Sequence, residues 1–534
     1  MKKLLLSICI IALATVTYSQ SFTWIDSSPV NYNLNPYYTN FAVELDESNN
    51  RVYSIYLEAG NEIYSSHVFG DLIMESRDLN GTLVWSKPLG NKVNVPMIET
   101  DGTGAIYIAG SFMDTLVFSP GNTLINTGSG FNLNYFIAKF DATGNFLWSR
   151  NLSASINNIF SIEDIESDHN GNIWYAICTL TNKRFAYITR IDAMGNDLQS
   201  RTIEGAVTVG AISFDPFGGL YVSGDAGMGT FIVEADTFAA PFAYNIYLAR
   251  YGSDGQPKWA EFGNTVTVIK PRVIADNQGN AFLTGNRYVA LSFGNVQLGP
   301  SPWISHYFLF KTDSMADFKW ASPPSPAPNL PLGEFNVGQT WYTGIDDNGN
   351  VYMMGSQRGT IDYGNGFILN TSSPANRMIS ILKVNSNGQT DWVKLAGNDL
   401  FNVSQSLTSS STGDCYFTSY VNDSAFFDNF FVQSGSAMNY IVGKISSTTT
   451  GIEDHNSFDD LSLIGNPSSG ILQLPEQLLG SELRVYSMTG SLFYTESELK
   501  STRLELSDVG EGVYVVQCIN GNALFSEKWV NTGR

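Results

Sequence analysis

The stretch Asp346-Asp-Asn-Gly-Asn-Val-Tyr352 decides the fold, because it is one of seven copies of a turn motif. Each copy begins with an acidic or small residue, turns at a Gly or Asn, and ends in an apolar run that carries an anchor aromatic. Successive anchor aromatics are 54, 67, 47, 61, 70 and 64 residues apart, which suits one four-stranded propeller blade with loops of varying length. The other copies are Glu47-Ser-Asn-Asn-Arg-Val-Tyr53, Asp101-Gly-Thr-Gly-Ala-Ile-Tyr107, Asp168-His-Asn-Gly-Asn-Ile-Trp174, Asp215-Pro-Phe-Gly-Gly-Leu-Tyr221, Asp276-Asn-Gln-Gly-Asn-Ala-Phe282 and Ser410-Ser-Thr-Gly-Asp-Cys-Tyr416.

The segments after these turns are typical of propeller strands. They are short and apolar without strict alternation, as expected for strands that are covered on both faces. A Gly follows the anchor aromatic by three residues in four copies and predicts a close backbone approach. These glycines are Gly110, Gly224, Gly285 and Gly355. The sequence therefore predicts an all-β chain with a seven-bladed β-propeller over residues 21–450.

A Trp motif follows each turn motif at a variable distance. It consists of an apolar pair, a basic residue, an apolar residue, a turn and usually Trp, as in Lys383 to Trp392. The third repeat has Leu198 and Gln199 in place of the Trp, and the seventh keeps only Lys444. The remaining copies are Arg77 to Trp85, Lys139 to Trp148, Arg250 to Trp259 and Lys311 to Trp320.

The truncated seventh repeat raises the question of how the ring closes. Unpaired strand edges favour aggregation, so a ring must hide the edges where its first and last strands meet. Phe22-Thr-Trp24 resembles the Trp-bearing strand that the seventh repeat lacks. We predict that residues near Trp24 pair into the last blade, the alternative being a loose amino-terminal arm.

Composition and charge indicate the export route of the chain, the partners that it disfavours and the state of its cysteines. Residues 1–20 have the charged start and apolar core of a secretory signal peptide, and their apolar run is too short for a stable membrane span. The formal net charge of −21 makes nucleic acid a poor partner. Cys178, Cys415 and Cys518 lie in separate apolar runs, which predicts isolated buried thiols rather than a disulfide framework.

The carboxy-terminal region has a different pattern. A polar and acidic linker, residues 451–460, is followed by short apolar segments in residues 461–534. Asn520-Gly521 lies between the last two segments and is the strongest hairpin signal in the chain. The pattern predicts a small C-terminal β-sandwich.

Four motifs in this sandwich carry a family resemblance. Gly465-Asn-Pro-Ser-Ser-Gly470, Leu483-Arg-Val-Tyr-Ser-Met-Thr-Gly490, Leu504-Glu-Leu-Ser-Asp-Val-Gly-Glu-Gly-Val-Tyr514 and Lys528-Trp-Val530 resemble the type A sorting domain of type IX secretion cargo. The chain departs from the family pattern with Gly465 for a Pro and Ser487 for an Asp. The sorting-domain motif residues are Asn466, Pro467, Gly470, Val485, Tyr486, Gly490, Gly512, Tyr514 and Lys528.

This resemblance implies a destination rather than an activity. It implies that the signal peptide takes the chain across the inner membrane, and that the type IX secretion machinery recognises the sandwich for passage across the outer membrane. The protein is then secreted or displayed on the cell surface. The amino-terminal repeats also resemble bacterial propeller repeats that often accompany this sorting domain.

A search for chemistry gives no local catalytic motif. The four histidines, His67, His169, His306 and His455, are scattered, so the sequence predicts no zinc site. No nucleophile elbow, phosphate-binding loop or Cys–His pair is present. The Asp-rich turns offer oxygen ligands, yet they lack the Glu that completes a calcium loop, and hairpin turns explain them. We therefore expect no enzyme, no catalytic or metal-binding residue and no cofactor, with calcium as the one open alternative.

The surplus of aromatic residues suggests binding. Aromatic side chains suit stacking on sugars or wide protein contacts. Those outside the repeated positions could line a binding face, and they are Tyr32, Tyr37, Tyr38, Trp303 and Trp341. We expect an exported propeller that binds an extracellular protein or glycan as a scaffold.

Two alternatives stay open. One is a hydrolase or lyase that acts on extracellular polysaccharide and takes its acids from different blades, so that no local motif results. The other is a structural adhesin. The central channel discriminates, because carboxylates with shifted pKa values there favour the enzyme, whereas Ser, Thr and aliphatic residues favour the scaffold.

Overall fold

The computed structural model describes residues 18–32, 42–64, 67–126, 133–168, 170–264, 270–299, 304–323, 333–371, 377–398, 402–432, 438–449, 463–464, 466–468, 470–487, 492–506, 509–520 and 523–533. Of the predicted signal peptide, residues 1–17 lie outside these ranges. The chain divides into two compact units, with residues 20–447 in one and residues 448–534 in the other. Across the described ranges, no helix is long and apolar enough to cross a membrane.

The unit of residues 20–447 repeats one antiparallel arrangement. In the sixth repeat the inner strand β26 (Thr343–Ile345) leads through the turn motif into β27 (Val351–Arg358), which pairs with β30 (Met378–Val384). The Trp motif then leads into the outer strand β31 (Thr390–Ala396). An additional strand, β25 (Glu334–Val337), also pairs with β27.

The other repeats follow the same order from inner to outer strand. The first repeat has β2 (Ala42–Asp46), β3 (Arg51–Tyr64), β4 (His67–Arg77) and the start of β5 (Leu83–Thr100), and the second has the end of β5, β6 (Ile106–Phe112), β9 (Asn134–Phe140) and β10 (Phe146–Asn151). The third repeat has β11 (Ile159–Ser167), β12 (Ile173–Leu180), β13 (Arg184–Ile191) and β14 (Asp197–Glu204), and the fourth has β15 (Ala206–Phe214), β16 (Leu220–Val233), β17 (Asp236–Tyr251) and β18 (Pro257–Asn264). The fifth repeat has β19 (Arg272–Ala275), β20 (Ala281–Arg287), β23 (His306–Thr312) and β24 (Phe318–Ser322).

The seventh repeat has β32 (Asn402–Ser409), β33 (Cys415–Asn422) and β36 (Met438–Thr449), and its outer neighbour is β1 (Tyr18–Tyr32). Four small hairpins are inserted between second and third strands. A 3-10 helix, η2 (Leu152–Ala154), follows β10. The hairpins are β7 (Thr115–Ser119) with β8 (Asn122–Ile125), β21 (Leu291–Phe293) with β22 (Val296–Leu298), β28 (Thr360–Asp362) with β29 (Ile368–Asn370), and β34 (Ala425–Phe427) with β35 (Phe430–Val432).

The turn motif forms the predicted hairpin between inner and second strands. One carboxylate oxygen of Asp346 accepts hydrogen bonds from the backbone N–H groups of Asn348 and Asn350, at 3.0 and 2.9 Å. Gly349 has a φ of 71°, a conformation that glycine adopts without steric cost. The acidic residue therefore closes its own turn, which confirms the interpretation of these segments as hairpins.

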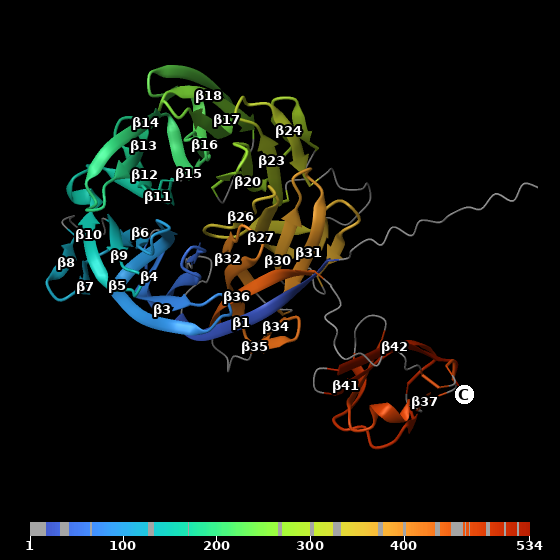
Figure 1. Ribbon diagram of the computed structural model, residues 1–534. Helices are drawn as coiled ribbons and strands as arrows, with labels where there is room; N and C mark the ends of the chain where they lie inside the picture. The colour runs from blue at the N-terminus through green and yellow to red at the C-terminus, as the bar shows by residue number, and fades with distance from the viewer. Residues whose placement is uncertain are drawn as a thin grey trace, which may run out of the picture. The chain divides into compact units, whose positions relative to one another are not determined.

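The repeats are arranged in chain order around a central axis (Figure 1). Each inner strand contacts the inner strand of the next repeat, from β2 through β5, β11, β15, β19, β26 and β32 back to β2. The sheets themselves are partly merged, because β14 pairs with β16 and so joins the third and fourth repeats in one sheet. The predicted all-β, propeller-type fold is confirmed at this level.

The amino-terminal strand closes the ring, as predicted. β1 lies between β36 of the seventh repeat and β3 of the first. Phe22 packs against Phe417 and Phe427, with ring centroids 5.7 and 5.3 Å apart. The ring of Trp24 lies 6.3 Å from that of Tyr416. The alternative of a loose arm is excluded.

The unit of residues 448–534 has its own core. One sheet has the order β39 (Leu492–Glu496), β38 (Glu482–Ser487), β41 (Gly512–Asn520) and β42 (Ala523–Asn531), and β37 (Ile471–Gln473) pairs with β40 (Arg503–Glu505). A short 3-10 helix, η3 (Glu476–Leu478), follows β37. Two paired sheets around a common hydrophobic cluster agree with the predicted small β-sandwich.

Candidate functional site

Three glutamates occupy equivalent positions on the inner strands of three consecutive repeats. Glu44 on β2, Glu99 on β5 and Glu166 on β11 each pair directly opposite the anchor aromatic of their repeat. Because the inner strands surround the central axis, the equivalent register brings the three side chains to one level of the channel. The same position holds Ser213, Ile274, Gly344 and Thr408 in the other repeats.

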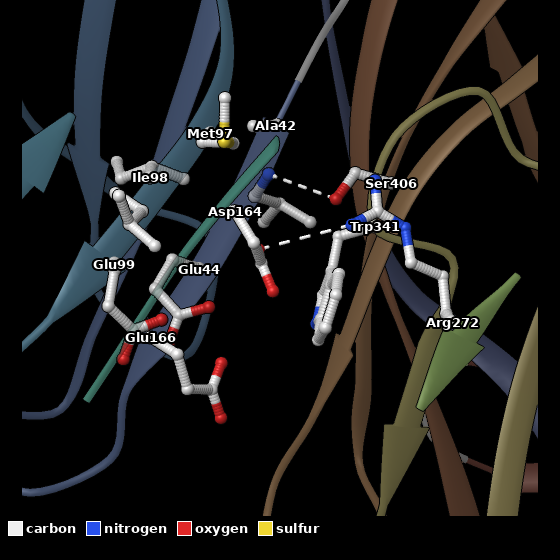
Figure 2. Close-up of a pocket in the computed structure, with 12 residues that line it drawn as sticks. Ala42, Glu44, Met97, Ile98, Glu99, Asp164, Glu166, Arg272, Trp341 and Ser406 are labelled. Carbon is white, nitrogen blue, oxygen red and sulfur yellow. Dashed lines mark hydrogen bonds and ion pairs between the residues drawn. The ribbon is translucent and has the colours of Figure 1, made fainter. Parts of the chain in front are cut away.

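A cavity is formed between these glutamates and the opposite side of the ring. Figure 2 shows Glu44, Glu99 and Glu166 together on one side and Trp341 and Arg272 on the other. Arg272 lies two residues before Ile274 on β19, so its side chain points to the same face of the strand as that position. The cavity therefore has an acidic wall and a wall made of one aromatic ring and one guanidinium group.

Glu99 holds a proton near neutral pH. Burial, together with the negative charge of Asp164, raises the pKa of its carboxyl group to about 8. The backbone N–H of Ser167 in the next repeat donates a hydrogen bond to Glu99 at 3.2 Å and partly offsets this effect. A carboxyl group with such a pKa can donate a proton at neutral pH.

Glu44 and Glu166 are perturbed in the same direction. Burial raises the pKa of both carboxyl groups well above the ordinary value, and the charge of Glu99 raises each pKa further. Three neighbouring carboxyl groups cannot all ionise cheaply in a poorly solvated site. Near neutral pH the three carboxyl groups of the acidic wall therefore favour their protonated forms.

Asp164 lies between the two walls and is 4% exposed. Burial raises the pKa of its carboxyl group to about 7, while the positive charge of Arg272 acts in the opposite direction. Asp164 accepts a hydrogen bond from the backbone N–H of Ile212 at 2.8 Å, and its carboxylate lies 3.9 Å from the guanidinium of Arg272. These contacts fix the carboxylate in place.

Arg272 connects Asp164 to the aromatic side of the cavity. Its guanidinium group lies 4.8 Å from the centre of the Trp341 ring and donates a hydrogen bond to the carbonyl of Gly210. The Trp341 carbonyl accepts a hydrogen bond from the backbone N–H of Leu407, at 2.6 Å. The ring is therefore held from its backbone and from one side by a cation–π contact.

This arrangement is suited to acid–base chemistry. A protonated carboxyl group can donate a proton to a leaving oxygen, and an ionised neighbour can accept a proton from water. Within the described ranges, no three His, Cys, Asp or Glu side chains are placed so that they could hold a metal ion. The chemistry open to these residues themselves is proton transfer and nucleophilic attack by carboxylate.

The sequence points to one residue of this site, Trp341, and not to the others. Trp341, one of the aromatic residues suggested for a binding face, lines the cavity. Tyr37, Tyr38 and Trp303 lie outside the described residues, and only the backbone of Tyr32 is described. The signal for the glutamates was an acidic residue two positions before the turn Asp in the second and third repeats.

The first repeat has the same spacing, because Glu44 lies two positions before Asp46, but its turn is one residue longer and the motif there begins at Glu47. The strand register shows that Glu44 pairs with Tyr53 as Glu99 pairs with Tyr107. Asp164 and Arg272 had no counterpart in any repeated pattern.

The sorting-domain motif residues take structural roles within the sandwich. The side chain of Asn466 donates a hydrogen bond to the Lys528 carbonyl at 2.5 Å and accepts one from the backbone N–H of Val530 at 2.9 Å. Val485 is fully buried, and Tyr514 packs on Trp529 at 5.7 Å between ring centroids. Gly490 lies outside the described residues, whereas Pro467, Gly470, Tyr486, Gly512 and Lys528 lie within them.

The prediction of isolated buried thiols agrees with the structure. Cys178, Cys415 and Cys518 are buried and free. His306 is buried within β23, where burial lowers the pKa of its imidazole to about 4. The cysteines and this histidine lie apart from the acidic wall and supply no chemistry to it.

Comparison with known proteins shows the fold class and little more. The sequence matches no protein-family model, and no curated protein is similar to it. Among solved structures, a DUF4221 family member from Bacteroides vulgatus is 8% identical, with 81% of this chain and 99% of that chain covered and a TM-score of 0.31. PhoX from Pseudomonas fluorescens is 9% identical, with 80% and 95% covered and a TM-score of 0.34.

The NanB sialidase from Streptococcus pneumoniae is 10% identical, with 79% of this chain and 70% of that chain covered and a TM-score of 0.32. These neighbours are propeller-type proteins, which agrees with the repeat architecture. At such scores the likeness assigns no activity or ligand to this chain.

The expectation that the protein is not an enzyme is contradicted. PhoX, with its bound transition-state analogue, and the NanB sialidase are enzymes of propeller type. The expectation depended on the lack of a local catalytic motif, and a ring of inner strands makes such a motif unnecessary. Acids from separate repeats meet in the channel, and carboxyl groups with shifted pKa values there favour an enzyme.

Proposed function

We propose that the protein is an enzyme that cleaves the backbone of an extracellular polysaccharide, a hydrolase or a lyase. The observation that carries this proposal is the group of three glutamates at one level of the channel, facing Trp341 across a cavity. Cleavage of a glycosidic bond commonly uses two carboxyl groups in different protonation states. An aromatic ring beside them is suited to the apolar face of a sugar.

The pKa values of Glu99 and Asp164 assign the roles of general acid and base to these two residues. Glu99, with a pKa of about 8, is protonated at neutral pH and serves as the general acid. Asp164, with a pKa of about 7 and fixed by Ile212 and Arg272, is partly ionised and serves as the base or nucleophile. Glu44 and Glu166, whose own pKa values are raised by burial and by the charge of Glu99, complete the acidic wall.

The ring itself is best described as seven blades. The cyclic contacts of seven inner strands support this count, and so do the seven turn motifs and the closing role of β1. The merged sheet of the third and fourth repeats is then a blade contact in which β14 pairs with the elongated β16. An experimental structure with another number of inner strands around the channel would contradict this description.

Residues 461–534 are proposed to direct export through the type IX secretion machinery, after removal of the signal peptide. Support comes from the four motifs and from the buried or hydrogen-bonded positions of Asn466, Val485 and Tyr514. Deletion of residues 451–534 in the native cell should leave the chain inside the outer membrane, as measured by fractionation and immunoblotting. Unchanged export of the deleted chain would contradict the assignment.

The catalytic proposal is tested on the purified full-length chain. A panel of polysaccharides is incubated with the protein, and cleavage is measured both as new reducing ends and as the absorbance of unsaturated products. Glu99→Gln keeps the hydrogen bond from Ser167 but removes the titrating proton, so it should lower the rate by about 100-fold or more. Glu58→Gln, at an exposed glutamate of β3, is the matched control and should retain the full rate.

Absence of cleavage on the whole panel, or an unchanged rate in Glu99→Gln, contradicts the proposal. Binding of a polysaccharide without its cleavage would indicate a binding scaffold instead of an enzyme. A pH profile adds a second readout, because the rate should fall as pH rises through about 8, where Glu99 loses its proton.

A further inference from the structure

We propose that Phe426 and Phe431 form a carbohydrate-binding site on the outer side of the ring, which holds the polysaccharide away from the channel. This inference rests on the proposed function for the class of ligand and goes beyond it, because it assigns a second place on the molecule to that ligand. The two residues belong to the hairpin of β34 and β35, which lies at the outer edge of the ring (Figure 1). The glutamates of the acidic wall lie on inner strands instead.

The two phenylalanine rings form the outward side of this hairpin. Phe426 pairs directly with Phe431, and the ring centroids lie 4.8 Å apart. The two residues are 60% and 52% exposed, whereas the other residues of the two strands are buried or partly buried. The backbone groups of Phe426 exchange hydrogen bonds with those of Gly397 at 2.9 Å, which attaches the hairpin to the end of β31. A ligand therefore meets two rings on a fixed backbone, so that little conformational entropy is lost on binding.

The fold does not require aromatic side chains at these positions. The hairpin of β21 and β22 in the fifth repeat has two strands of the same length and the same register, and it also follows the second strand of its repeat. Its middle, exposed pair is Ser292 with Gln297. The same scaffold is thus built with a polar pair, and the exposed rings of the seventh repeat take no part in its hydrophobic cluster. Adjacent exposed apolar side chains of this kind are typical of a binding site.

The area of the exposed pair fits a sugar rather than a protein. A phenylalanine side chain has on the order of 200 Å² of surface, so two rings that are each exposed by about half offer on the order of 200 Å² together. A stable contact between two proteins, including two copies of this chain, needs about 800 Å² on each partner. One or two sugar rings need no more than the area of the pair, because a sugar ring is as wide as a phenyl ring and stacks on its face.

The groups around the two rings are polar. Asn422 and Asp423 precede the hairpin and Asn429 lies in its loop, and all three are exposed. Amide groups donate and accept hydrogen bonds, and a carboxylate accepts them, so each can bond to a hydroxyl group. A sugar has apolar faces and a rim of hydroxyl groups, which matches an aromatic pair with polar neighbours. The geometry therefore favours a sugar ring stacked on Phe426 and Phe431.

The site is tested by affinity electrophoresis of the full-length chain in native gels that contain a soluble polysaccharide. The panel consists of dextran, laminarin, xylan, xyloglucan, glucomannan and methyl-esterified pectin, and Glu99→Gln is the background, so that no substrate is consumed. At least one polysaccharide should retard the chain. F426S/F431Q reproduces the exposed pair of the fifth repeat, so it should fold, and its affinity for that polysaccharide should be lower by about tenfold or more.

Two further variants separate ring stacking from a change in the hairpin. Phe426→Tyr combined with Phe431→Tyr keeps both flat rings and should retain the retardation. Ser292→Ala combined with Gln297→Ala changes the equivalent exposed pair of the fifth repeat and should also retain it. Circular dichroism and the unfolding midpoint show whether each variant is folded.

The outcomes separate this site from the proposed function. The site is overturned if no polysaccharide of the panel retards the chain, if folded F426S/F431Q is retarded as strongly as the chain with both rings, or if the folded tyrosine variant loses the retardation. Dimers in light scattering that F426S/F431Q lacks would assign the pair to self-association and also overturn it. Cleavage by the native chain with retardation that is independent of the pair overturns only the site. Retardation that depends on the pair without cleavage by the native chain supports the site and contradicts only the enzyme.

Discussion

At the scale of single residues, the glycine three positions after the anchor aromatic sets how closely strands can pack. A Cβ atom built on Gly355 would lie 2.2 Å from the ring of Phe335 and 2.6 Å from the carbonyl oxygen of Asn336. At Gly224 it would lie 2.1 Å from the carbonyl oxygen of Thr208. Both glycines stand in extended strands, so the requirement is space rather than backbone conformation.

Gly355→Ala should therefore destabilise the ring. The added methyl group must displace the Phe335 ring and the strand β25, and overpacking of this kind costs about 1–3 kcal/mol. The free energy of unfolding is measured by chemical denaturation. Gly227→Ala on β16 is the matched control, because a Cβ there has no neighbour within 4 Å. Equal stabilities of the two variants would contradict the packing argument.

The channel glutamates make stability depend on pH in a defined direction. Burial raises the pKa of Glu99 to about 8, so the folded chain retains a proton that the unfolded chain releases near pH 4.3. The folded state then binds more protons between these values, and stability falls as pH rises from about 4 to about 8. The contribution of the Glu99 proton to the free energy of unfolding is complete below about pH 4 and is lost above about pH 8.

Glu99→Gln should remove this part of the pH dependence. Relative to the native chain, the variant is expected to gain more than about 1 kcal/mol of stability between about pH 5 and about pH 8. Denaturant unfolding at the two pH values gives the comparison, and Glu58→Gln serves as the exposed control. An equal gain at both pH values would show that the Glu99 carboxyl is not titrating in this range.

At the scale of elements, tryptophans of the Trp motif fasten one repeat to the next. The indole N–H of Trp320 donates a hydrogen bond to the Ser386 carbonyl at 3.1 Å, and Trp148 does the same to Ala193 at 2.8 Å. Each indole lies against a glycine of the neighbouring turn, so that a Cβ on Gly388 would be 2.6 Å from the Trp320 ring. The motif is thus an inter-repeat contact.

The third repeat keeps this contact with a different side chain. It has no Trp, yet Arg201 on β14 reaches the same place and lies within 3.0 Å of a Cβ built on Gly255 in the next repeat. Its guanidinium group lies 5.4 Å from the ring of Trp174 and 5.1 Å from that of Tyr251. A planar cation between two rings fills the position of a planar indole.

The contribution of the indole hydrogen bond can be measured with an internal control. Trp392 is buried, whereas Trp320 is partly buried, and the indole N–H of Trp392 has no hydrogen-bond partner among the described residues. Trp320→Phe loses ring area and the bond to Ser386, whereas Trp392→Phe loses ring area alone. Trp320→Phe should therefore be less stable by about 1 kcal/mol in denaturant unfolding. The reverse order would contradict the fastening role.

At the scale of the whole molecule, the sequence predicts the elements that recur in every repeat but not the residues that different repeats contribute to one cavity. The turn motif, the Trp motif and the closing strand near Trp24 each leave a local pattern, so the all-β ring could be predicted. Trp341 could be proposed because it departs from the repeat. Glu44, Glu99 and Glu166 are separated in the chain by whole repeats, and only the packing of successive inner strands brings them to one cavity.

Ring closure by the amino-terminal strand leads to the last prediction. β1 contacts both ends of the repeat series: Phe22 packs on Phe417, Trp24 donates a hydrogen bond to the Leu79 carbonyl at 3.1 Å, and Asp26 pairs with Arg77 at 2.7 Å. Without β1, the outer edge of β36 and the start of the first repeat lose their shared partner. Unpaired strand edges favour association between chains.

A chain that lacks residues 1–32 should therefore be less stable and should aggregate, as measured by light scattering and by the unfolding midpoint. A chain that lacks residues 451–534 is the matched control, because the sandwich has its own hydrophobic cluster and its removal takes no strand from the ring. That chain should retain the unfolding midpoint of the ring. Equal behaviour of the two truncated chains would show that β1 is dispensable, and the ring would have to be held closed by contacts between inner strands alone.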